Sequence, residues 1–211
     1  MRRVLVLTGP SGVGKTSVAE QILRECPHFS LVRSATTRER RGDRHGDEYI
    51  YLDKDEFLRR VASGEMVEYT EYSGNYYGTP KSELERIFSE GKIPLLILDI
   101  RGAVSAKRIT EEFKSLNIYL WEELSTVVSR LYKRAVNDPT GIEKIEKRML
   151  ANKRDYKSLS EYGVYFDAFV KSEEVSKSAA ECISIFNKIK ESNERSEFDN
   201  SEIIAKLSSY Q

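Results

Sequence analysis

The stretch Gly9-Pro-Ser-Gly-Val-Gly-Lys-Thr16 fits the phosphate-loop pattern of a glycine, four residues, Gly-Lys, and then serine or threonine. Its glycines allow a tight turn that brings backbone N–H groups up to phosphate oxygens, where a Cβ would clash. Lys15 adds a positive charge for the outer phosphates of a nucleotide, and the hydroxyl of Thr16 can ligate Mg²⁺. A helix that begins here also directs the positive end of its dipole at the anion. The residues expected to bind these phosphates are Gly9, Ser11, Gly12, Val13, Gly14, Lys15, Thr16 and Ser17.

The sequence on either side of this loop supports the interpretation. Residues 3–8 form an apolar run typical of a buried parallel strand, and residues 17–24 have the spacing of an amphipathic helix. A phosphate loop needs a strand before it and a helix after it, whereas an ordinary glycine-rich turn does not. We therefore expect a nucleotide site at the start of the chain.

Length, charge and cysteine content limit the number of domains, the kinds of partner and the cellular compartment that we expect. The 211 residues are enough for one large domain, or for one domain with small inserts. The 34 basic and 34 acidic residues cancel, so the overall charge gives no reason to expect a nucleic-acid or membrane partner, and we expect neither. Cys26 and Cys182 lie far apart without metal-ligand spacing, which is typical of reduced thiols in a cytoplasmic protein. No apolar run approaches the length needed to span a membrane.

The rest of the chain alternates between strand-like and helix-like patterns. Apolar runs at 93–99, 115–121 and 164–170 predict strands, and helical patterns cover 104–113, 123–135, 142–159 and 173–190. This alternation predicts an α/β fold with a parallel core sheet flanked by helices. Asp99 ends one of these runs, and open α/β sheets bind ligands at the carboxyl ends of their strands.

Residues 34–80 interrupt the alternation and predict a small mixed α+β insert. Strands are expected at 49–52 and 66–72, and a helix capped by Asp53 at 54–63. The segment 34–47 holds four arginines and almost no apolar residue, so we expect it to lie outside the core. It is either a solvated loop or an anion site, because guanidinium groups bind phosphate through paired hydrogen bonds.

Two further segments have open interpretations. Residues 136–141 contain helix breakers and predict either a plain loop or a mobile lid. The tail at 191–211 is polar until Ile203, Ile204 and Leu207, which suggest a short amphipathic helix. A frayed terminus is the favoured alternative, so we expect removal of residues 193–211 to leave activity unchanged.

Over residues 1–190 the chain resembles the guanylate kinases. The motifs that carry the resemblance are the phosphate loop, Ser34-Ala-Thr-Thr-Arg38 with Arg41-Gly42-Asp43, Gly74-Asn-Tyr-Tyr-Gly-Thr79, and Leu98-Asp-Ile-Arg-Gly102. Many NTPases share the first motif, whereas the second and third together are close to diagnostic. The resemblance implies a P-loop kinase fold with a core (1–33, 81–134 and 149–190), a GMP-binding insert (34–80), a lid (135–148) and a polar tail (191–211).

The resemblance also implies phosphorylation of GMP, and of dGMP, by ATP with Mg²⁺. A carboxylate at Glu68 suits guanine because it can accept hydrogen bonds from both N1–H and the N2 amino group, whereas adenine has neither donor there. Arg38, Arg41, Tyr49 and Tyr77 match positions that hold the GMP phosphate. The full set of implied substrate-binding residues is Ser34, Arg38, Arg41, Tyr49, Glu68, Tyr77, Gly78, Thr79 and Asp99.

Phosphoryl transfer between two bound nucleotides depends mostly on positioning and charge neutralisation. We expect Thr16 to organise Mg²⁺, with Asp99 serving either Mg²⁺ or guanine. We expect the chain to act as a monomer or a homodimer. The residues expected to stabilise the transferred group are Lys15, Arg38, Arg41, Arg134 and Arg148.

The chain departs from the family pattern at two places. Ile97 and Arg101 stand where the family usually has Asp and Gln. Lys171-Ser172 stands where it usually has Asn-Asp, whose Asn contacts the donor adenine. Because an ammonium donates hydrogen bonds and accepts none, Lys171 predicts weaker discrimination between ATP and GTP. Two alternatives remain open: a non-catalytic guanylate-kinase-like domain that binds nucleotide or protein, and a related kinase with another acceptor. Such non-catalytic domains tend to lose phosphate-loop residues, whereas Lys15 and Thr16 are present here.

Overall fold

A computed structural model describes residues 2–40, 49–72, 74–108, 112–135, 141–192 and 199–210. Several sequence predictions fall outside this part of the chain. They are Arg41, the side chain of Arg134, and residues 136–140 of the expected lid.

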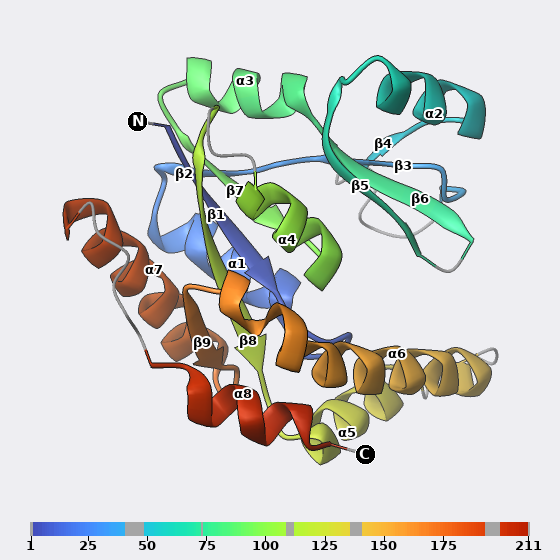
Figure 1. Ribbon diagram of the computed structural model, residues 1–211, viewed down its shortest axis with the longest axis vertical. Helices are drawn as coiled ribbons and strands as arrows, with labels where there is room; N and C mark the ends of the chain where they lie inside the picture. The colour runs from blue at the N-terminus through green and yellow to red at the C-terminus, as the bar shows by residue number, and fades with distance from the viewer. Residues whose placement is uncertain are drawn as a thin grey trace.

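The core of the molecule is a five-stranded parallel sheet, which confirms the predicted α/β fold (Figure 1). Its strand order is β2-β7-β1-β8-β9, so the strand before the phosphate loop lies at the centre. The strands are β1 (Arg3–Thr8), β2 (Phe29–Leu31), β7 (Ile93–Ile97), β8 (Lys114–Trp121) and β9 (Ala168–Lys171).

Helices cover both faces of this sheet because successive side chains of a strand point to opposite sides. In β1, Val4 and Val6 enter one apolar cluster, and Leu5 and Leu7 enter the other. The second cluster is completed by α1 (Lys15–Glu25) and α7 (Val175–Ser192). The first cluster is completed by α3 (Lys81–Ser89), α4 (Ile100–Arg108), α6 (Gly141–Tyr162) and α8 (Ser201–Ser208), and α5 (Leu124–Ala135) packs on α6.

A second sheet, of order β4-β3-β6-β5, projects beside α4 (Figure 1). It consists of β3 (Ser34–Thr36), β4 (Tyr49–Tyr51), β5 (Met66–Tyr72) and β6 (Asn75–Pro80), and it is followed by α3. The helix α2 (Lys54–Ala62) joins β4 to β5, and Asp53 caps it by accepting a hydrogen bond from the backbone N–H of Glu56 at 2.8 Å.

The expectation that residues 34–47 lie outside the core is wrong at the start of that segment. Ala35 and Thr36 are fully buried in β3, where Ala35 packs with Phe57 and Met66. A strand of only three residues is too short to show a periodic pattern, and pairing with β4 and β6 defines it instead.

The helix expected from residue 104 begins earlier, at Ile100. The Oδ1 atom of Asp99 accepts a hydrogen bond from the backbone N–H of Gly102 at 2.7 Å, as an N-cap does. Gly102 therefore lies in the first turn of α4.

The C-terminal tail contains the predicted amphipathic helix, and α8 is packed rather than frayed. Leu207 is fully buried, Ile204 contacts Gly163, and the rings of Tyr210 and Tyr156 lie 5.2 Å apart edge to face. These contacts attach the tail to α6 and to the turn that follows it. The expectation of unchanged activity without the tail stays a prediction.

Cys26 and Cys182 are free thiols. Within the described residues, no helix combines the length and apolar character that crossing a membrane requires.

Candidate nucleotide site

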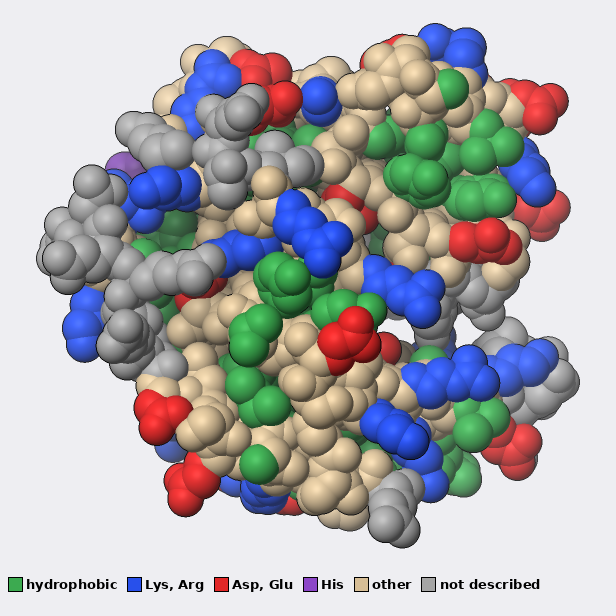
Figure 2. Space-filling view, in the orientation of Figure 1, with side chains coloured by type: hydrophobic (Ala, Val, Ile, Leu, Met, Phe, Trp, Pro, Cys, Tyr) green, Lys and Arg blue, Asp and Glu red, His purple; other side chains and the backbone are tan. Residues whose placement is uncertain are grey.

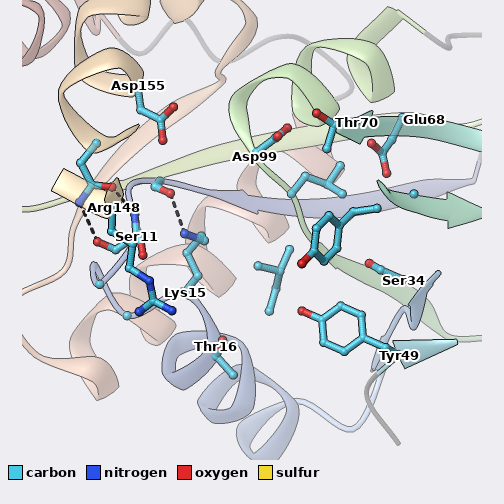
Figure 3. Close-up of a pocket in the computed structure, with 18 residues that line it drawn as sticks. Ser11, Lys15, Thr16, Ser34, Tyr49, Glu68, Thr70, Asp99, Arg148 and Asp155 are labelled. Carbon is cyan, nitrogen blue, oxygen red and sulfur yellow. Dashed lines mark hydrogen bonds between the residues drawn. The ribbon is translucent and has the colours of Figure 1, made fainter. Parts of the chain in front are cut away.

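An inner cavity of about 430 Å³ opens where β1 and β7 end (Figure 3). The phosphate loop lies at one end of this cavity, near Arg148 of α6. The second sheet supplies the other end with Glu68 and Tyr49. The cavity is therefore built from three parts of the chain that are distant in sequence.

The phosphate loop needs its first glycine for steric reasons. Gly9 has φ of +148°, and a Cβ on it would lie 2.2 Å from the carbonyl oxygen of Leu120. The loop wraps around its own lysine, because Lys15 Nζ donates to the carbonyl oxygens of Gly9 at 2.6 Å and Pro10 at 3.1 Å. The lysine charge thus already lies where phosphate oxygens are expected.

Side chains from later elements hold the outer side of the loop. Arg130 of α5 donates to the carbonyl oxygens of Val13 at 2.9 Å and Ser172 at 2.8 Å. The Ser172 hydroxyl donates to the same Val13 oxygen at 2.9 Å, and Asn152 of α6 binds the backbone of Ser11. The conformation of the loop is therefore fixed by contacts that do not depend on a ligand.

The opposite end of the inner cavity contains a buried carboxylate. Glu68 accepts a hydrogen bond from the hydroxyl of Thr79 at 2.7 Å. Burial is the main cause that raises the pKa of Glu68 to about 7; the hydrogen bond from Thr79 opposes this rise, and the nearby charge of Asp99 contributes to it. Both carboxylates approach Gly102, where a Cβ would lie 2.8 Å from Glu68 Oε2 and 3.2 Å from Asp99 Oδ1.

An outer cavity of about 940 Å³ continues from this end, between the second sheet and α6. Arg38 lies there with its guanidinium carbon 5.4 Å from the centre of the Tyr49 ring, and that ring packs edge to face on Tyr77. Among the described residues, the buried Nε of Arg38 has no hydrogen-bond partner. Figure 2 shows this region as a hollow with Lys and Arg side chains along its sides. The outer cavity is thus suited to an anion.

Most of the predicted site residues lie around these cavities. Thr79 lies behind Glu68, and Val13, Ser17 and Lys171 line neither cavity. The Lys171 ammonium contacts Glu173 and lies 5.6 Å from the centre of the Trp121 ring. The predicted residues that line the inner cavity are Gly9, Ser11, Gly12, Gly14, Lys15, Thr16, Ser34, Tyr49, Glu68, Tyr77, Gly78, Asp99 and Arg148.

The structure adds cavity residues that the sequence analysis missed. Thr70 lies beside Glu68 on β5, and Asn152 and Asp155 follow Arg148 on one face of α6. Burial raises the pKa of Asp155 to about 6, partly offset by the positive charge of Lys15. Residues 148, 152 and 155 are spaced by four and then three positions, so the sequence does indicate that they share one face of a helix. Because α6 carries many other charged residues, this spacing alone does not identify the face that lines the cavity.

The site is compatible with Mg²⁺. Thr16 and Asp99 line the same inner cavity, and Mg²⁺ usually takes one or two protein oxygens together with water and substrate phosphates. The described residues contain no cluster of three or more His, Cys, Asp or Glu side chains that would form a complete protein cage. A hydroxyl, a carboxylate and nucleotide phosphates therefore form a suitable donor set.

Comparison with known proteins identifies the family. Residues 1–189 match the sequence pattern of guanylate kinases. The chain belongs to the guanylate kinase family. Guanylate kinases of Streptomyces kasugaensis and Prochlorococcus marinus are 37% and 36% identical, over 77% and 80% of this chain and 78% and 85% of their own lengths. The crystal structure of guanylate kinase from Anaplasma phagocytophilum superposes with a TM-score of 0.67 at 25% identity, over 89% of this chain and 85% of that one.

Proposed function

We propose that this guanylate kinase family member transfers the γ-phosphoryl group of ATP to GMP or dGMP, forming ADP and GDP or dGDP. One observation carries the proposal: the inner cavity joins Lys15 of a complete phosphate loop to Glu68, the carboxylate suited to guanine. A donor phosphate and an acceptor base therefore have places at opposite ends of one cavity.

At the donor end, the phosphate-loop backbone and Lys15 bind the ATP phosphates, and Thr16 holds the metal ion. Lys15 exchanges its bonds to the carbonyl oxygens of Gly9 and Pro10 for phosphate oxygens when ATP enters. Arg148 lines both cavities, so its guanidinium can neutralise charge on the transferred group. The chemistry needs no strong base because the acceptor is already a phosphate oxyanion.

At the acceptor end, Glu68 accepts from the guanine N1–H and N2 amino groups, and Ser34 and Thr79 lie nearby to complete base recognition. Arg38 provides an unpaired Nε for the GMP phosphate, beside Tyr49 and Tyr77. Arg41 belongs to the same phosphate set in this proposal.

Each segment has a role in this proposal. Residues 34–80 bind GMP, residues 135–148 form a lid that closes over the donor phosphates with Arg134, and residues 1–33, 81–134 and 149–190 form the core. Closure excludes water, which would otherwise accept the phosphoryl group. The second sheet supports this division, because it supplies Ser34, Tyr49 and Tyr77 to the cavity as one unit.

Thr16 would hold Mg²⁺, with Asp99 binding it directly or through water, and the ion would neutralise charge on the phosphoryl oxygens. Asp99 also caps α4, and this fixes one of its carboxylate oxygens toward Gly102. The cap orients the side chain before any ligand arrives. We place the protein in the cytoplasm, as a monomer or a homodimer.

A coupled assay that offers each nucleoside monophosphate in turn with ATP and Mg²⁺ tests the proposal. We expect turnover with GMP and dGMP and only background rates with AMP, CMP and UMP. GMP binding without any turnover would instead favour a non-catalytic binding domain. Efficient turnover of another monophosphate would assign the acceptor end to a different base.

A further inference from the structure

Asn152 of α6 makes an unusual contact with the phosphate loop. Its Nδ2 donates to the carbonyl oxygen of Ser11 at 2.9 Å, and its Oδ1 accepts from the backbone N–H of Ser11 at 2.7 Å. The side chain is fully buried, and dashed lines mark these bonds at Ser11 in Figure 3. One amide therefore pairs with both polar backbone groups of a single loop residue.

This pair fixes the loop from a distant part of the chain. Residues 11 and 152 are 141 positions apart, so the contact joins α6 directly to the loop between β1 and α1. Buried hydrogen bonds of this kind are costly to break, because each leaves a desolvated group without a partner. Asn152 thus holds Ser11 in one orientation within the turn that receives the phosphates.

The same contact sets the position of α6 relative to the loop. Arg148 lies one helical turn before Asn152, and both line the inner cavity. The N-terminal part of α6, residues 141–148, belongs to the expected lid, so a fixed point at Asn152 just after it holds this end of the helix against the donor phosphates. A shift of α6 would move the Arg148 guanidinium away from the phosphate loop.

We propose that Asn152 is a positioning residue that orders the phosphate loop and aligns Arg148 for the triphosphate of the donor. The inference rests on the donor half of the function proposed above. It assigns a role in donor affinity, and not in acceptor affinity, to a side chain whose amide is already bonded to the backbone of Ser11. An amide that only filled space in the core would affect stability alone.

The first test compares Asn152→Leu with wild type in calorimetric titrations with ATP and Mg²⁺. Leucine has the same number and branching of side-chain heavy atoms as asparagine but makes neither hydrogen bond, so we expect ATP affinity to fall by about tenfold or more. The Michaelis constant for GMP should stay within about twofold. Lys153→Ala, at an exposed neighbouring position on α6, is the matched control and should bind ATP like wild type.

The second test uses Asn152→Asp, whose function should depend on pH. A protonated carboxyl group has one donor and one acceptor and can reproduce the amide pair with Ser11, whereas a carboxylate has no donor for the Ser11 carbonyl oxygen. The ratio of variant to wild-type ATP affinity should therefore rise as pH falls. This test follows the aspartate variant and wild type across pH, so it does not depend on the leucine variant being stable.

The outcomes separate the two proposals. ATP affinity within about twofold of wild type in folded Asn152→Leu, or a pH-independent ratio for Asn152→Asp, would overturn the positioning role and leave the proposed kinase activity intact. A wild-type protein that binds no ATP would overturn both.

Discussion

At the phosphate-loop end of the inner cavity the polar groups bind one another, whereas at the acceptor end charged groups are buried with few partners. Lys15 is held by the carbonyl oxygens of Gly9 and Pro10. In contrast, Glu68 is almost completely buried with a pKa raised by burial, and Arg38 has a buried Nε without a partner among the described residues.

This difference indicates that the two nucleotides are bound in different ways. The donor end is already ordered, so ATP replaces existing contacts of Lys15 at low cost in reorganisation. The acceptor end carries a desolvation penalty that only a ligand with the right donors relieves. Selectivity should therefore be greatest at the acceptor end, and the largest rate contribution should come from the donor end.

Replacing the lysine should disrupt the donor end most. Lys15→Ala removes the charge that meets the outer phosphates, and we expect kcat to fall by about 10²-fold or more. Because the lysine faces the cavity, the melting temperature should change little. Lys114→Ala, at an exposed position at the start of β8, is the control. Near wild-type turnover in folded Lys15→Ala would refute the role of Lys15 in phosphoryl transfer.

Replacing the carboxylate should disrupt the acceptor end alone. Glu68→Gln keeps the size of the side chain, but the amide can accept from only one guanine donor while its own NH₂ meets the other. We expect kcat/KM for GMP to fall by about tenfold to a hundredfold, with the Michaelis constant for ATP unchanged. Glu65→Gln, at an exposed position before β5, is the control. Equal losses for GMP and ATP would contradict a base-specific role.

The raised pKa of Glu68 should make GMP use depend on pH. Guanine needs the ionised carboxylate, so lowering the pH from about 8 to about 6 through a pKa of about 7 should raise the Michaelis constant for GMP about tenfold. Glu68→Gln should remove most of this dependence. An unchanged pH profile in that variant would assign the titration to another group, with Asp155 the first to examine because its pKa is about 6.

The raised pKa of Glu68 also determines how the stability of the folded protein changes with pH. The folded-state pKa of Glu68 is raised from 4.5 to about 7, so the contribution of this group is complete below pH 4.5 and is lost as the pH rises through 7. The pKa of Asp155 is raised from 3.8 to about 6, so this group changes stability in the same direction over a lower pH range. At neutral pH both carboxylates therefore lower stability.

How far the sequence predicts the structure depends on the element. The long apolar run of β1 and the glycine pattern of the phosphate loop are local signals, and both predict the observed geometry. The three-residue strand β3 and the early start of α4 were not predictable from periodicity, because strand pairing and the Asp99 cap define them. Asn152 was missed for a different reason: its partner is the backbone of Ser11, and backbone groups leave no mark on sequence patterns.

The smallest expected effect is at Lys171. Replacing it tests whether the preformed contacts at the donor end also include the residue that recognises the donor base. The ammonium contacts Glu173 and lies over the Trp121 ring, outside both cavities. An ammonium engaged in this way interacts weakly with a purine edge, yet it offers donors only, whereas asparagine offers the donor and the acceptor that adenine matches. We therefore expect Lys171→Asn to increase the preference for ATP over GTP, measured as the ratio of the two kcat/KM values, by less than about tenfold. Lys177→Asn, at an exposed position on α7, should leave the ratio unchanged. If wild type and Lys171→Asn show the same ratio, the backbone at Val170 or Ser172 recognises the donor base, and the lysine only binds Glu173.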